Sequence, residues 1–299
     1  MLFGLGPVEI VLILVPIALV VAGLGHVEIV LIFVPVALFV ALGVGIARMA
    51  RRDEADEWAG AHGLALSETT RPLVVGYLTR SRRFRLTGAL VGLVVPFGTE
   101  IPGLEMIAGY LIGALIAELT QDRLRAEGGM AASLSPRVLS DYVPAYVTVI
   151  LRAAAVGGVA LGSLLLWGPA RASDLGPPRV TALAAAVGAV ALPPVIELLL
   201  KRVVARPQPA VSSELVRADD AIRSASLHAA AGAGIAVSLL LLGTVAFAAG
   251  VASDVQLARW TLPFVGLAAS LTGVAFWLHL GPDTPWRVRR AAAAHEVGA

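Results

Sequence analysis

The sequence predicts an all-α fold, a polytopic membrane bundle of about eight transmembrane helices. Its composition is 58% apolar and 15% charged, with a mean hydropathy of +0.83, which exceeds what a soluble core of 299 residues can bury. Eight apolar stretches divide the chain, and 19 of the 23 Lys and Arg residues lie on one side if every stretch crosses a bilayer. Because short loops rich in Lys and Arg stay in the cytoplasm, both termini are predicted to be cytoplasmic. The abundance of Ala and Arg indicates high-GC coding and hence a bacterial inner membrane.

The residue types that are missing exclude several functions. With no cysteine, the chain has no disulfide, no thiolate nucleophile and no Cys-ligated metal centre. The five histidines are scattered without metal-ligand spacing, and neither a phosphate-binding loop nor a nucleophile elbow is present. A net charge of +2 argues against nucleic-acid binding. We therefore predict no catalytic, cofactor-binding or metal-binding residues, and no nucleic-acid partner.

Residues 1–47 are predicted to be a tandem-duplicated transmembrane pair. Residues 6–22 match residues 25–41 at 13 of 17 positions, and each copy is long enough to cross about 30 Å of hydrocarbon. One interpretation is an antiparallel pair in which Glu9 and Glu28 are equivalent. The other is a tandem duplication that added one hairpin arm, and without the first copy the helix count becomes seven.

Residues 48–85 form an Arg-rich amphipathic segment on the cytoplasmic side. The pattern predicts two short helices broken at His62-Gly63, the second beginning near Thr70 with Pro72 in its first turn, where a missing N–H costs nothing. Such a helix lies on a lipid surface, so we expect contacts with anionic headgroups. The predicted contacts are Arg80, Arg82, Arg83 and Arg85.

Residues 86–119 predict a Gly-rich hairpin, either two full spans or a re-entrant pair. Gly88 and Gly92, and then Gly109 and Gly113, repeat at a spacing of four, which allows two helices to approach by backbone contact. Both alternatives return the chain to the cytoplasmic side.

The second half predicts two transmembrane hairpins, residues 143–200 and 225–280. Residues 172–181 match residues 252–261 at five of ten positions, and this similarity indicates a parallel repeat of the two hairpins. The remaining segments are a cytoplasmic loop at 120–142, a second at 201–224 that begins an amphipathic entry helix, and a cytoplasmic tail at 281–299.

Ionisable residues within predicted spans each cost roughly 2.5–3.5 kcal/mol at the centre, and four of them are weighed as site residues, whereas Glu118 is explained by its place near a helix end. Arg152 and His228 occupy equivalent positions of the repeat, and Arg152 either snorkels to the headgroups or serves an anion or proton path. Glu197 follows Pro193-Pro194, whose missing N–H groups break the helical ladder. Glu105 lies near a helix end. These four are the candidate site residues.

Two segments have a distinctive sequence, Arg71-Pro-Leu-Val-Val-Gly-Tyr-Leu-Thr-Arg80, which continues to Leu90, and Ile101-Pro-Gly-Leu-Glu-Met-Ile-Ala-Gly-Tyr110, which continues to Leu119. Through them the chain resembles a family of uncharacterised multi-pass integral membrane proteins of high-GC Gram-positive (actinobacterial) bacteria. The resemblance runs from about residue 27 to 280 and departs at the duplicated start. It implies a membrane bundle and assigns no activity.

Three functions remain open. The first is a non-enzymatic membrane scaffold or accessory subunit, which binds membrane-protein partners or a second copy of itself. The second is a secondary transporter with a midplane cavity near Pro193-Pro194, Glu197, Arg152 and His228. The third is a membrane-embedded enzyme. A polar, water-filled interior favours transport, whereas an interior filled by Ala and Leu favours the scaffold.

Overall fold

The computed structural model describes residues 52–94, 104–120, 130–131, 138–167, 177–206, 208–209 and 212–281. Within these residues the protein is all-helical, as predicted, apart from two strands of two residues each that pair antiparallel, β1 (Met130–Ala131) and β2 (Gln208–Pro209). A short 3-10 turn, Leu139–Asp141, precedes α6. The helices are α3 (Arg52–Ala61), α4 (Arg71–Val94), α5 (Leu104–Leu119), α6 (Tyr146–Trp167), α7 (Pro177–Val204), α8 (Ser213–Ala252) and α9 (Gln256–Leu280).

Four of the described helices, α6 to α9, are long and apolar enough to cross a membrane. The predicted count of about eight spans is not confirmed. Both copies of the duplicated segment 1–47 lie outside the described residues. The 16 residues of α5 extend about 24 Å, less than the roughly 30 Å of a hydrocarbon core, and α4 carries arginines as far as Arg85.

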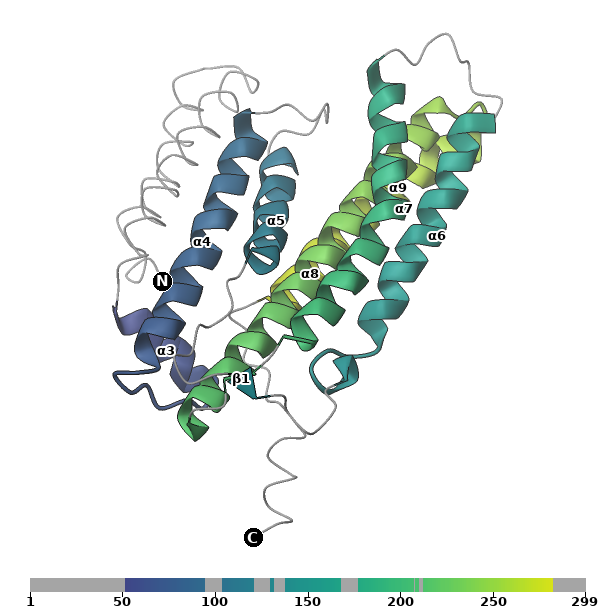
Figure 1. The fold of residues 1–299 in the computed structure, drawn as a ribbon. Coiled ribbons are helices and arrows are strands. Elements are labelled where there is room, and N and C mark those ends of the chain that lie inside the picture. The colour runs from purple at the N-terminus through teal and green to yellow at the C-terminus, as the bar shows by residue number, and fades with distance from the viewer. Residues whose placement is uncertain are drawn as a thin grey trace, which may run out of the picture.

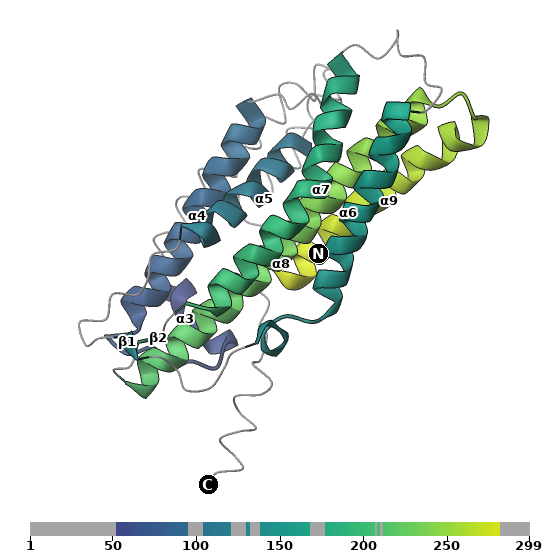
Figure 2. The same ribbon diagram turned by 45° about the vertical axis from the view of Figure 1, so that its right-hand side comes forward.

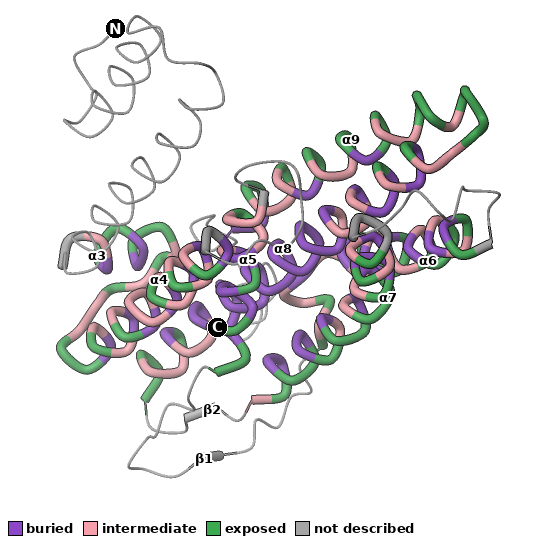
Figure 3. The backbone as a smooth tube through the Cα atoms, turned by 90° about the horizontal axis from the view of Figure 1, so that it is seen from above, coloured by how far each residue is buried: buried purple, intermediate pink, exposed green. Residues whose placement is uncertain are grey.

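Helix α8 is the central element of the bundle. Its 40 residues extend about 60 Å, twice the thickness of a hydrocarbon core. Every residue from 221 to 238 is buried, and most are Ala, Gly or Ser. Figures 1 and 2 show α4 and α5 on one side of α8 and α6, α7 and α9 on the other, and Figure 3 shows the buried positions concentrated along α8. A helix that is apolar all round belongs inside a bundle.

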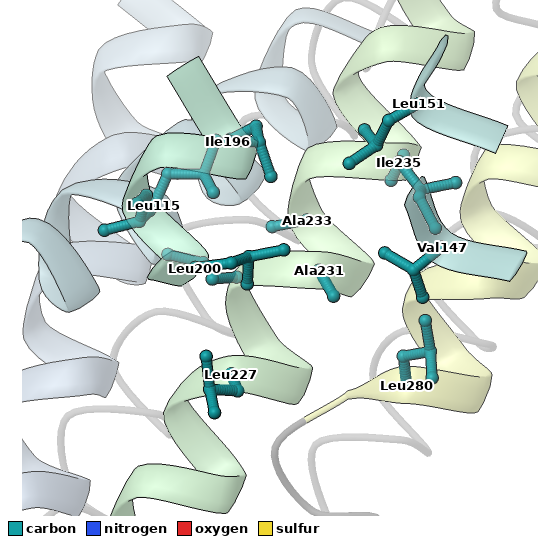
Figure 4. Close-up of a cluster of buried hydrophobic side chains, with 14 of the residues drawn as sticks. Leu115, Val147, Leu151, Ile196, Leu200, Leu227, Ala231, Ala233, Ile235 and Leu280 are labelled. Atoms are coloured by element: carbon teal, nitrogen blue, oxygen red, sulfur yellow. The ribbon is translucent and has the colours of Figure 1, made fainter. Parts of the chain in front are cut away.

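The main core lies where α5, α6, α7 and α9 meet α8 (Figure 4). Close approach depends on small residues of α8, because a Cβ atom added at Gly234 would lie 2.7 Å from Cγ2 of Ile196. Large side chains of the surrounding helices fill the remaining space. They include Leu115, Val147, Leu151, Ile196, Leu200 and Leu280.

The outer surface of the bundle is apolar. Of the 25 residues of α9, only Gly266, Gly273 and Leu280 are buried, and all three lie against α8 or its neighbours. Leucine, valine and aromatic side chains cover the rest of its surface, as they do on the outer faces of α6 and α7. An aqueous solvent disfavours a patch of this size, whereas hydrocarbon favours it.

The α4–α5 hairpin confirms the predicted close approach of its glycines. The Cα atoms of Gly88 and Gly109 each lie against the backbone carbonyl of the other, so neither position has room for a side chain. Gly113 lies in the same way against the carbonyl of Phe84, and Gly92 against that of Glu105. The two helices therefore pack backbone to backbone, as small residues spaced four apart permit.

A small head lies at the end of the bundle where α8 begins; we define it as α3, residues 71–82 of α4 and residues 213–225 of α8. Trp58, Tyr77 and Ile222 are at its apolar centre. Gly63, with φ at +67°, turns the chain between α3 and α4, as the sequence predicted.

An ion pair on the surface of the head also ties α3 to α4. Arg71 donates to both carboxylate oxygens of Asp56, at 2.7 and 2.8 Å. This hydrogen bonding holds the pKa of Asp56 below its ordinary value. The pair therefore contributes stability above the unfolded carboxyl pKa of about 4 and loses that contribution as the pH falls through the lower folded value.

Gly88→Ala is expected to destabilise the protein, because the new methyl group would overlap the backbone of α5. Overpacking of this kind costs about 1–3 kcal/mol, more than the helix propensity that alanine adds. The matched control is Gly76→Ala in the same helix, where nothing lies within 4 Å of the new methyl group. Thermal unfolding in detergent should show a lower midpoint for Gly88→Ala and an equal or higher one for Gly76→Ala. Equal midpoints for wild type and Gly88→Ala would refute the backbone contact.

Candidate functional site

A cluster of charged side chains lies at one end of the bundle, which we call the arginine-rich end: α5 and α7 finish there, and α6 and α8 begin there. Several charged residues at this end are buried rather than solvated. Residues Arg85, Glu118 and Arg223 are only 6%, 1% and 3% exposed, respectively. Buried charges require partners, so the partners define what this cluster does.

Three arginines donate to backbone carbonyls at the ends of α5 and α7. Arg206 donates through Nη2 to the carbonyl of Glu118 at 2.6 Å, and Arg80 donates to the carbonyl of Thr120. Arg223 donates through Nη1 to the carbonyls of Val204 and Arg206, at 2.9 and 2.8 Å. The last carbonyls of a helix have no partner within it and carry the negative end of the helix dipole. Guanidinium groups satisfy both needs.

Side-chain contacts of the same cluster involve α4, α8 and α9. Arg223 also donates to Asp219 at 2.6 Å within α8. Arg85 donates to Ser81 at 2.6 Å within α4, and its guanidinium lies 5.5 Å from the ring centre of Trp277 in α9. The last contact connects α4 to α9.

The Glu118 carboxyl group is buried among these arginines. Burial raises its pKa, and the nearby guanidinium groups of Arg85 and Arg206 and the hydroxyl groups of Ser226 and Tyr77 oppose that shift. Burial lowers the pKa of Arg206, and the Glu118 carboxylate opposes that shift. The hydrogen bonds of Arg206 and Arg223 connect this buried cluster to the ends of α5 and α7. In the part of the chain that the structure describes, no three His, Asp or Glu side chains gather to hold a metal ion.

Of the four residues that the sequence singled out, two meet. Arg152 of α6 binds Glu197 of α7 through two parallel hydrogen bonds, Nε to Oε1 at 2.9 Å and Nη2 to Oε2 at 3.1 Å. The Arg152 side chain is 69% exposed and that of Glu197 is 17% exposed, so the pair lies on the outer surface of the bundle. Helix α7 continues without a break through Pro193 and Pro194.

His228 and Glu105 lie elsewhere. His228 is buried in α8, and its Nδ1 is 2.8 Å from the carbonyl of Ser224 one turn earlier. Glu105 is in the first turn of α5, at the opposite end of that helix from Glu118. A cavity of about 40 Å³ lies in the head, between the turn at Gly63 and the first turns of α8, and none of the four candidates lines it.

The structure assigns new roles to most of the arginines predicted to contact lipid headgroups. Arg80 caps α5, Arg82 is paired with Glu54, and Arg85 is buried. Arg83 alone of the four is exposed. The capping role of Arg206 and Arg223 was not predicted, because their acceptors at Glu118 and Val204 lie 88 and 19 residues away in the sequence.

Comparison with protein-family models, with curated proteins and with solved structures found no match to this chain. A function for this chain is therefore inferred from its fold and its arginine cluster alone.

Arg223→Met is expected to lower the free energy of unfolding by about 3 kcal/mol or more, because it leaves Asp219 and two carbonyls without their donor in a buried place. Arg217→Met is the matched control, since Arg217 is an exposed arginine in the same part of α8. Its effect should stay within about 0.5 kcal/mol. Denaturation in detergent measures both. Similar losses for the two variants would contradict the capping role of Arg223.

Proposed function

We propose that the protein is a non-enzymatic scaffold or accessory subunit of a bacterial inner membrane. Helices α6 to α9 cross the bilayer, and the arginine-rich end faces the cytoplasm in accordance with the excess of Lys and Arg on that side. In this role the protein holds its head, and any partner bound to the head, at a fixed position on the membrane.

The observation that carries this proposal is the filled interior around α8. Ala230, Ala233 and Ala236 are fully buried, and side chains from the neighbouring helices pack against them. A transporter of the predicted kind needs a midplane cavity lined by polar groups. The Arg152–Glu197 pair, which would be its most suitable polar group, lies on the outer surface instead.

The rigid connection between head and bundle supports the same role. Helix α8 runs without interruption from the head through the core, and its buried Arg223 is bonded to the end of α7, while Arg206 after α7 is bonded to the end of α5. A partner bound to the head would therefore be held in a defined orientation to the bilayer. Such positioning needs no chemical step.

Labelling of single cysteines tests the proposal, because the natural chain has none. Ala230→Cys and Ala236→Cys place a thiol at buried positions of α8 with little change in volume. A membrane-impermeant maleimide, applied to right-side-out and to inverted vesicles, should label neither. In a transporter with an aqueous path, at least one of these thiols would react from one side.

Two exposed positions are the controls for orientation. Ser213→Cys, at the start of α8, should react only in inverted vesicles, and Val255→Cys, between α8 and α9, only in right-side-out vesicles. Reaction of Ala230→Cys or Ala236→Cys from either side would refute the scaffold proposal. The reverse pattern at the two controls would refute the orientation.

A further inference from the structure

A strip of charge crosses an otherwise apolar surface of α6 and α7. It consists of Arg152, Glu197 and Lys201, and Lys201 follows Glu197 by four residues and thus lies on the same face of α7. Around Arg152, the exposed residues of α6 are Val149 at 65% and Val156 at 69%. Charges on a surface of this kind need a specific explanation, because hydrocarbon does not solvate them.

The strip lies close to one end of the membrane-spanning segments of α6 and α7. The span in α6 begins at Tyr146, so the Cα atom of Arg152 is about 9 Å along the helix from that end. The span in α7 ends at Val204, which places Glu197 about 10 Å and Lys201 about 5 Å from the same side. The strip therefore leads from the edge of the hydrocarbon inward by less than two helical turns.

The charges of the strip do not cancel, since two cations share one carboxylate. Glu197 engages Nε and Nη2 of Arg152, which leaves Nη1 as the donor for a further acceptor. Lys201 is exposed and its ammonium group interacts with Glu197. The strip thus leaves Nη1 of a guanidinium held by Glu197 and an exposed ammonium group, with one positive charge in excess. This arrangement is complementary to a phosphate group.

We propose that this strip binds the headgroup of an anionic phospholipid of the inner leaflet. The phosphate accepts hydrogen bonds from Lys201 and from Nη1 of Arg152, while the acyl chains lie along Val149 and Val156. Glu197 orients the guanidinium and at the same time weakens the attraction for the phosphate. The inference depends on the membrane placement proposed above but not on the scaffold role, so its test and the cysteine labelling fail independently.

Lipid binding to the purified full-length chain, followed by native mass spectrometry, tests the site. The probes are phosphatidylglycerol and phosphatidylcholine with identical acyl chains. Wild type should bind the anionic lipid at least about fivefold more tightly, and Lys201→Gln should lose about fivefold of that affinity, since one surface cation contributes about this factor. Arg202→Gln is the control, because Arg202 is exposed but rotated by about 100° around α7. Its affinity should stay within about twofold of wild type.

Two further variants separate a binding site from a merely structural ion pair. Glu197→Gln removes the competing carboxylate and should increase the affinity for phosphatidylglycerol. Arg152→Gln combined with Glu197→Gln replaces the pair by two uncharged groups of similar size and should lower the affinity. Equal binding of the two lipids, equal effects of Lys201→Gln and Arg202→Gln, or weaker binding by Glu197→Gln would each overturn the proposal.

Discussion

The complete burial of the middle of α8 is the constraint on which the rest of the structure depends. A helix surrounded on all sides can be approached closely only where its side chains are small, and residues 221–238 supply Ala, Gly and Ser at most positions. Four neighbouring helices then contribute the large side chains of the core, such as Ile196 beside Gly234. Because the centre is filled in this way, the outer helices turn their remaining apolar side chains outward, where hydrocarbon accommodates them.

The same arrangement explains why arginines are buried at one end. Helices α5 and α7 finish against α8, inside the protein, so water does not reach all of their last carbonyls. A guanidinium group brings several donors and a positive charge to a place that needs both. Arg206 and Arg223 supply these to α5 and α7, and Asp219 pairs with Arg223. The positive character of this end thus has a structural cause.

Features fixed by local sequence could be predicted, and features fixed by distant contacts could not. The break at His62-Gly63, the helical start of α8 and the close approach of Gly88 to Gly109 follow from turn residues and helical spacing. The partner of Arg152 lies 45 residues away, and no periodicity identifies it. Arg85 was expected among lipid headgroups but is buried beside Trp277, which comes from the last helix of the bundle. The predicted equivalence of the two hairpins stays a prediction.

Oxidative cross-linking in native membranes tests the central position of α8 most directly. The distances predict disulfides between Gly232→Cys and Leu280→Cys, whose Cβ atoms would be 3.1 Å apart, and between Gly234→Cys and Ile196→Cys, where a Cβ atom at 234 is 2.7 Å from a γ atom at 196. Gly232→Cys with Leu278→Cys, on the exposed face of α9, should remain reduced. Formation of the first two disulfides without the third agrees with a central α8. Failure of either one, or equal yield in the third, would contradict it.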